Sequence, residues 1–174
     1  MRIGIIVCGL NGSGKSTLGK ALAEKLGFYF IDDEDLFFGE KDASYVYSEP
    51  RTRQEAEKIL LNKVTAHENF VFSAVKGDYG KEIFPFYKYA VFIDVPADIR
   101  MSRVRSRSFQ KFGDRMLPGG DLYEQEETFF NMAAARTEDY VEGWLQSLNC
   151  PIIRVDGTKP VEENVNFIAE KIQF

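Results

Sequence analysis

A glycine-rich segment near the N-terminus constrains the fold of this chain more than any other feature. Residues 9–17 read Gly-Leu-Asn-Gly-Ser-Gly-Lys-Ser-Thr and match the spacing G-x-x-x-x-G-K-[ST] at every fixed position. The segment follows a β-branched apolar run at residues 2–8 and precedes apolar residues at helical spacing in residues 15–26. A buried strand, a glycine loop and a helix in this order predict the first unit of an α/β fold with a parallel sheet.

The residue types in this loop suit a phosphate ligand. Its three glycines let backbone N–H groups turn inward and leave no Cβ between the chain and a phosphate. The helix that begins near Lys15 adds its positive dipole end, Lys15 can reach the β- and γ-oxygens, and the Ser16 hydroxyl can ligate Mg²⁺. The segment therefore predicts a phosphate loop that binds ATP or another nucleoside triphosphate with Mg²⁺. The nucleotide-binding residues predicted in this loop are Gly9, Asn11, Gly12, Ser13, Gly14, Lys15, Ser16 and Thr17.

Short apolar runs alternate with longer amphipathic segments along the rest of the chain. Further strands are expected at residues 28–31, 70–75, 89–95 and 151–155. Further helices are expected at residues 53–68, from Pro96 onward, at about 121–148 and at 160–172. Strands separated by helices of this length indicate βαβ units, so the sequence predicts an α/β fold, a three-layer sandwich around a parallel sheet.

Composition and length exclude several classes of protein. A chain of 174 residues without repeats or linker-like tracts is expected to form one domain. The formal net charge of −5 argues against nucleic acid or an anionic membrane surface as a partner. Two cysteines, Cys8 and Cys150, cannot form a disulfide scaffold, and no apolar run reaches the length of a membrane helix. We therefore expect a cytoplasmic monomer or homodimer with a small-molecule substrate.

Four acidic residues follow the second expected strand, at residues 32–35. A carboxylate at this point can orient a hydroxyl nucleophile and accept its proton during phosphoryl transfer. A solvated acidic turn that caps the next helix is the alternative, and four consecutive acids make it partly true in any case.

Arginines gather after the fourth expected strand, with four of them between residues 100 and 107. On a helix, Arg100, Arg103 and Arg107 share one face through their i, i+3, i+7 spacing. Arginine suits planar, bidentate contact with phosphate, whereas a solvated helix face would mix lysine with glutamate. The helix is expected to give way to a polar segment at residues 106–120, whose glycines fit a closing lid. Arginines that pair with nearby carboxylates are the alternative.

These features together resemble the small P-loop kinases, which include shikimate kinase, gluconate kinase and the nucleoside monophosphate kinases. The resemblance covers essentially the whole chain, taken as a single domain of residues 1–174. It implies a five-stranded parallel sheet in the order 2-3-1-4-5, with the first strand in the centre, and a short lid at about residues 108–120.

The same resemblance implies roles for individual residues. Asp32 and Glu34 occupy the two acidic positions of the Asp-x-Asp signature of shikimate and gluconate kinases. Asp32 would then be a catalytic residue near the magnesium ion, which Ser16 also ligates, and Glu34 would contact the substrate. Lys15 and Arg115, which stands where the charge-stabilising lid arginine falls, would neutralise the transferring phosphoryl group. The remaining implied nucleotide contacts are Arg107 at the start of the lid and Asp156, Gly157 and Lys159 in the loop that packs on adenine.

Three basic residues fall where these kinases build their acceptor site, namely Arg53, Lys76 and Arg136. Arg136 and Tyr140 resemble the R-x-x-x-Y element by which shikimate kinases hold a substrate carboxylate. Residues 75–80 read Val-Lys-Gly-Asp-Tyr-Gly where shikimate kinases place three consecutive glycines, which argues against shikimate itself. The basic residues predict an acceptor with a carboxylate or phosphate group, and a plain surface position of Arg53 and Lys76 is the alternative.

The predicted function is that of an ATP-dependent phosphotransferase, which moves the γ-phosphoryl group of Mg·ATP to a small anionic metabolite. Two alternatives stay open: a nucleoside monophosphate kinase, if Arg53 and Arg136 grip a phosphate, and a nucleotide-binding regulatory ATPase module. A GTPase switch is disfavoured because the chain lacks a D-x-x-G segment after the third strand and an [NT]-K-x-D motif. Ser73 and Ala74 stand where a mechanical ATPase would carry the acidic residue of its third strand.

Overall fold

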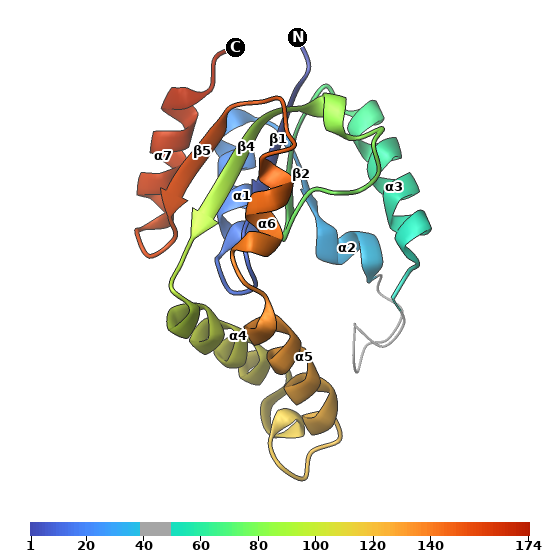
Figure 1. Ribbon diagram of the computed structural model, residues 1–174, viewed down its shortest axis with the longest axis vertical. Helices are drawn as coiled ribbons and strands as arrows, with labels where there is room; N and C mark the ends of the chain where they lie inside the picture. The colour runs from blue at the N-terminus through green and yellow to red at the C-terminus, as the bar shows by residue number, and fades with distance from the viewer. Residues whose placement is uncertain (39–49) are drawn as a thin grey trace.

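The computed structural model describes residues 1–38 and 50–174, which form a five-stranded sheet flanked by helices (Figure 1). The strands are β1 (Ile3–Cys8), β2 (Tyr29–Asp32), β3 (Asn69–Ala74), β4 (Tyr87–Asp94) and β5 (Ile152–Asp156). The α-helices are α1 (Lys15–Leu26), α2 (Asp33–Phe37), α3 (Arg53–Ala66), α4 (Ala97–Phe112), α5 (Tyr123–Ala135), α6 (Asp139–Leu145) and α7 (Val161–Lys171). Two short 3₁₀ helices complete the set, η1 (Phe84–Phe86) and η2 (Gly113–Met116).

The sheet confirms the expected topology. Its strand order is β2-β3-β1-β4-β5, and every neighbouring pair is parallel. The register places Cys8 beside Ala74 on one side and beside Phe92 on the other, so β1 is the central strand. Because all strands run the same way, the loops after Cys8 and Asp32 leave the sheet at the same edge, where ligands of open α/β sheets bind.

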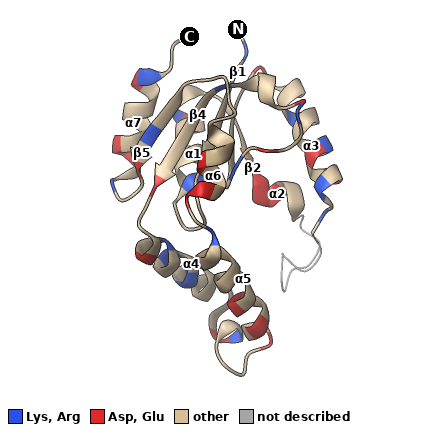
Figure 2. Ribbon diagram, viewed as in Figure 1, with Lys and Arg blue, Asp and Glu red and all other residues tan. Residues whose placement is uncertain are grey.

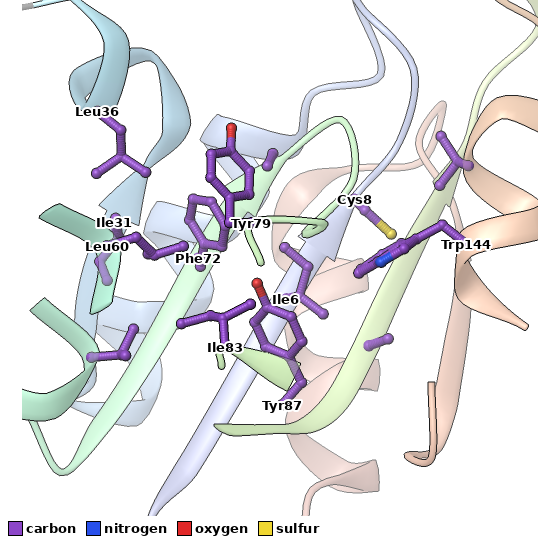
Figure 3. Packing of buried hydrophobic residues seen from close by; sticks show 14 of the residues in the cluster. Ile6, Cys8, Ile31, Leu36, Leu60, Phe72, Tyr79, Ile83, Tyr87 and Trp144 are labelled. Carbon is purple, nitrogen blue, oxygen red and sulfur yellow. The ribbon is translucent and has the colours of Figure 1, made fainter. Parts of the chain in front are cut away.

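Helices cover both faces of the sheet and explain why β1 is apolar at consecutive positions. Ile5 and Val7 point to the face that α1 and α7 cover. Ile6 and Cys8 point to the opposite face and pack with side chains of α3 and α6, such as Leu60 and Trp144 (Figure 3). A strand that is buried on both faces has no polar positions to alternate with its apolar ones.

Two of the expected helices have different bounds. The helix that was expected to give way at residue 106 continues as α4 to Phe112, because its second half packs against α5: the Ser108 hydroxyl donates a 2.6 Å hydrogen bond to the buried Glu126 carboxylate. The single helix expected at about 121–148 is in fact two, α5 and α6. Arg136 ends α5 in an extended conformation, and its guanidinium reaches Asn11 in the phosphate loop.

Helices α4 and α5, with η2 between them, form an arm that leaves the body of the sheet (Figure 1). A small core of Val104, Met116 and Phe130 holds the arm together. Residues 108–120, which the sequence assigns to a lid, make up the far part of this arm. Among the helices of the described residues, none has the length and apolar character needed to span a membrane.

Candidate active site

The phosphate loop follows β1 and turns sharply into α1. Gly12 and Gly14 have φ angles of 81° and 89°, a left-handed conformation that side chains with a Cβ rarely adopt. At Gly12 a Cβ would also clash with the carbonyl oxygen of Arg100 on α4. The Ser13 hydroxyl is buried without a hydrogen-bond partner in the described part of the chain. A loop that leaves a buried donor unpaired fits a ligand rich in acceptor oxygens, such as a phosphate.

Lys15 begins α1 and lies among charged side chains of both signs. The carboxylates of Asp33 and Asp32 and the guanidinium groups of Arg107 and Arg136 all act on it electrostatically. Burial lowers the pKa of the Lys15 ammonium, and the two carboxylates oppose this shift. Burial therefore outweighs the two carboxylates at Lys15, and a bound anion would favour its charged form.

A serine at the end of β3 fixes the start of α1. The Ser73 hydroxyl donates a 2.9 Å hydrogen bond to the carbonyl oxygen of Lys15. Gly19 permits this contact, because a Cβ there would clash with the Ser73 oxygen. The position that would be acidic in a mechanical ATPase thus serves to hold α1 against β3, a role that no pattern in the sequence indicated.

The acidic turn after β2 combines a helix cap with a charged site. The Asp32 carboxylate caps the short helix α2 by accepting a hydrogen bond from the Glu34 amide at 3.1 Å. Asp33 is the acid that acts most strongly on Lys15, and the Tyr79 hydroxyl donates to its Oδ2 at 3.4 Å. Burial raises the pKa of Asp33 to about 6, although Lys15 opposes the shift. The sequence singled out Asp32 and gave no role to Asp33, because four consecutive acids do not reveal which of them act on Lys15; the catalytic role of Asp32 stays a prediction.

Glu34 joins α2 to the arm. Its carboxylate accepts from Arg107 at 3.0 Å and from Lys111 at 3.4 Å. Figure 2 shows the acidic residues of α2 in red and the basic residues of α4 in blue. Arg107 pairs with a carboxylate here, as the alternative interpretation of the arginines stated. Such exposed pairs contribute about 0–1 kcal/mol, so this contact is weak enough for a ligand to replace.

Three other arginines hold the phosphate loop. Arg100 and Arg103 donate to the carbonyl oxygens of Asn11 and Gly12, at 3.4 and 3.3 Å. Arg136 donates to the Asn11 side-chain oxygen at 3.0 Å. The second guanidinium nitrogen of Arg103 reaches the Gly157 carbonyl at 3.1 Å, which ties the loop after β5 to the phosphate loop. The helical spacing placed Arg100 and Arg103 on the face of Arg107 but did not show that they contact backbone.

The loop after β5 has a defined internal structure. The Asp156 carboxylate accepts from the amide and hydroxyl of Thr158, at 2.9 and 2.6 Å, and these bonds lower the pKa of Asp156. Lys159 pairs with Glu163 at 3.1 Å. Asp156 and Lys159 thus shape the turn into α7, and the assignment of this loop to adenine stays a prediction.

Arg115 lies in the far part of the arm. Its guanidinium contacts both carboxylate oxygens of Asp121, at 3.0 and 2.8 Å, in a bidentate pair that is partly exposed. Arg115 thus pairs with Asp121 within the arm, and its role as a charge-stabilising arginine stays a prediction.

The basic residues expected at the acceptor site fall into two groups. The Lys76 ammonium lies 4.3 Å and the Arg136 guanidinium 5.0 Å from the centre of the Tyr140 ring. Arg53 lies 4.6 Å over the ring of Tyr79, the same residue that contacts Asp33, and also pairs with Glu57. The structure therefore brings Lys76 and Arg136 together on one ring.

The donor set fits a nucleotide-bound magnesium ion better than a protein-held one. No group of three or more His, Cys, Asp or Glu side chains able to hold a metal occurs within residues 1–38 and 50–174. Mg²⁺ bound with a nucleotide uses only one or two protein oxygens, because phosphates and water complete its shell. Ser16 and Asp32 can supply those oxygens.

The raised pKa of Asp33 leads to a test of this site by pH. Above about pH 6 the buried Asp33 carboxylate is ionised, which lowers the free energy of unfolding. Asp33→Asn should therefore raise the melting temperature of the ligand-free protein. The gain should shrink as pH falls through the folded pKa and vanish below about pH 4, where the unfolded aspartate is protonated too. Thermal unfolding in the presence of a metal chelator measures this gain in melting temperature across the pH range.

Asp121→Asn is the control of opposite sign, because Arg115 lowers the pKa of Asp121. A gain in melting temperature from Asp33→Asn that does not depend on pH would contradict the raised pKa of Asp33.

Comparison with known proteins agrees with this geometry. Residues 5–116 match the family described as an AAA domain. The chain is 29% identical to the "Uncharacterized protein YqaC" of Bacillus subtilis, over 98% of this chain and 97% of that protein. It is 28% identical to an adenylate kinase isoenzyme 6 homolog of Caenorhabditis elegans, over 97% and 88% of the two chains. It is 31% identical to a shikimate kinase of Clostridium botulinum, over 73% and 78%.

A solved structure shares the fold. A gluconokinase from Sinorhizobium meliloti superposes with a TM-score of 0.57 at 20% identity, and the match covers 98% of this chain and 95% of that one. The phosphate loop, the strand order and these relatives agree, so the chain belongs to the AAA-domain family matched over residues 5–116 and to the small P-loop kinase family that includes shikimate kinase.

Proposed function

We propose that this protein moves the γ-phosphoryl group of Mg·ATP to a small metabolite that carries a carboxylate or phosphate. The observation that supports it best is the surroundings of Lys15, which place carboxylates of Asp32 and Asp33 and guanidinium groups of Arg107 and Arg136 around one ammonium. Cations suit the phosphates of the donor and the anion of an acceptor, and a carboxylate suits the acceptor hydroxyl. A site that only hydrolyses the triphosphate would need cations for the triphosphate alone, and none for the anionic group of an acceptor.

In this proposal the steps of phosphoryl transfer are divided among the elements of the site. The phosphate loop and Lys15 bind the triphosphate, and Asp32 orients the acceptor hydroxyl and takes its proton. The acceptor oxygen forms a bond to the γ-phosphorus while the bond from that phosphorus to the β–γ bridging oxygen breaks, and ADP leaves. Ser16 and Asp32 would hold Mg²⁺, which would supply positive charge against the phosphates. Arg115 adds charge to the transition state when the arm closes over the nucleotide.

The acceptor's anionic group would bind at the ring of Tyr140. Lys76 and Arg136 approach this ring together, and Arg136 also contacts the phosphate loop through Asn11. Two cations beside the phosphate loop favour an acceptor whose carboxylate or phosphate lies close to its reacting hydroxyl. Glu34 would contact the acceptor once Arg107 has moved from it to the triphosphate.

A nucleoside monophosphate kinase is the second candidate. The similarity to the adenylate kinase isoenzyme 6 homolog extends over 97% of this chain, which favours a phosphate as the acceptor's reacting group. Arg53 and Arg136 would then hold the monophosphate. The two candidates differ only in the acceptor, so one assay separates them.

Release of ADP in a coupled assay tests the proposal. With Mg·ATP, a panel of hydroxy acids, sugar acids, nucleosides and nucleoside monophosphates should contain a compound that raises ADP release at least about tenfold over the acceptor-free rate. Lys15→Ala should abolish that increase while the fold stays intact, because Lys15 faces the ligand and glycines set the loop's shape. Lys20→Ala, on the exposed side of α1, is the matched control. ADP release that no acceptor class raises would count against a kinase, and a fully active Lys15→Ala would refute the site.

Arg115 offers a separate test of the arm. If Arg115 meets the phosphoryl group only after closure, Arg115→Ala should lower kcat by about 10³–10⁵ and change the Kd of Mg·ATP little. Arg115→Lys should rescue poorly, because lysine lacks the planar fork that matches phosphate oxygens. Steady-state kinetics with an active acceptor and equilibrium binding of Mg·ATP measure the two effects. If kcat stays within about threefold of the wild-type value, the arm acts through another arginine.

A further inference from the structure

Arg100 is a buried cation that forms no salt bridge with a carboxylate of the residues that the structure describes. It lies on the first turn of α4 and is 7% exposed, and within residues 1–38 and 50–174 it is the one lysine or arginine classed with the buried polar residues. Its Nε donates to the Val95 carbonyl at 3.0 Å and its Nη1 to the Asn11 carbonyl at 3.4 Å. Buried charges in proteins are nearly always paired, because transfer of an unpaired ion from water is costly.

Other arginines among the described residues form salt bridges with carboxylates. Arg105 pairs with Glu127, Arg107 with Glu34, Arg115 with Asp121 and Arg154 with Glu142. Each of these pairs lies at least partly in solvent. Arg100 is far more buried than any of them, yet no salt bridge to it occurs in the described part of the chain. Within residues 1–38 and 50–174, Arg100 is thus the one buried guanidinium, and no salt bridge to a carboxylate is formed by it there.

The position of this charge points to its missing partner. Gly12 packs directly on the backbone of Arg100, and the Arg100 guanidinium holds the carbonyl oxygen of Asn11. That carbonyl and the N–H of Gly12 belong to one planar peptide group and point in opposite directions. A donor on the carbonyl side therefore turns the Gly12 N–H away from Arg100. The Arg100 guanidinium therefore lies on the carbonyl side of the Asn11–Gly12 peptide, opposite the side to which the Gly12 N–H points. Lys15 lies at the start of α1, which follows the phosphate loop.

We propose that Arg100 is a positioning residue for the nucleotide, and that the phosphates bound in the loop are its counter-charge. Its guanidinium fixes the orientation of the Asn11–Gly12 peptide and places a permanent positive charge next to the Asn11 carbonyl of the phosphate loop. A guanidinium stays protonated inside a protein, and salt screens a buried charge far less than a surface one. This inference rests on the proposed function only as far as the ligand is a polyphosphate, and it assigns Arg100 no contact with the reacting atoms.

Binding of Mg·ADP and of inorganic pyrophosphate with Mg²⁺, measured by calorimetry, tests the role. Arg100→Gln keeps a hydrogen-bond donor but removes the charge, and it should raise both Kd values at least about tenfold, which is about 1.4 kcal/mol. Arg100→Lys keeps the charge and should bind both probes within about threefold of the wild type. Arg2→Gln is the control, because it removes a positive charge from an exposed residue next to the N-terminal end of β1, whereas the phosphate loop follows the C-terminal end. It should change neither of the two Kd values. Because pyrophosphate carries no base, an equal loss for both probes identifies the phosphates as the partner.

Unfolding of the ligand-free variants guards against a merely structural effect. Arg100→Met, a second neutral variant, should melt within about 4 °C of the wild type, because loss of an unbalanced buried charge offsets the lost hydrogen bonds. It should nevertheless bind both probes as weakly as Arg100→Gln. The inference is overturned if either neutral variant binds within about threefold of the wild type, or if Arg100→Lys loses as much affinity as Arg100→Gln. A wild-type protein that binds neither probe would instead contradict the proposed function.

Discussion

The hydrogen bonds from arginine side chains to the phosphate loop are the contacts on which the rest of the site depends. Arg100 and Arg103 of α4 hold the carbonyl oxygens of Asn11 and Gly12, and Arg136 at the end of α5 holds the Asn11 side chain. Both ends of the arm are thereby fixed to the loop that follows the central strand. Because these hydrogen bonds join the arm to the phosphate loop, we expect a ligand in this loop to act on the base of the arm as well.

The charges of the site are arranged for a ligand that is itself charged. Burial lowers the pKa of Lys15 and raises that of Asp33, so the ligand-free site disfavours charge on both groups. Arg107 and Glu34 meet each other at the surface, where their attraction is weak. A bound triphosphate would strengthen the cationic forms of Lys15 and its neighbours and would compete with Glu34 for Arg107. The buried charges of Lys15 and Asp33 thus lower the stability of the ligand-free fold, and we expect them to serve the binding of a charged ligand instead.

Local patterns predicted the parts of the fold that are decided locally. The bounds of α1 follow from the glycine loop before it and from Gly27 after it, and the parallel strands follow from their continuous apolar runs. The division between α5 and α6 could not be predicted, because it depends on the long-range contact of Arg136 with Asn11. The same holds for Asp33, which only the packing of Tyr79 and the position of Lys15 distinguish from its acidic neighbours. Contacts between elements, and the helix bounds that depend on those contacts, could not be predicted from the sequence.

The destination of the γ-phosphoryl group distinguishes a kinase from an ATPase. The wild-type protein is incubated with Mg·ATP labelled at that group, with and without a mixture of small metabolites, and the labelled products are separated. We expect that label passes to an organic anion only when the metabolites are present, and that Lys15→Ala transfers none. Label that appears only as inorganic phosphate, at the same rate with and without the metabolites, would refute the proposed transfer and identify an ATPase.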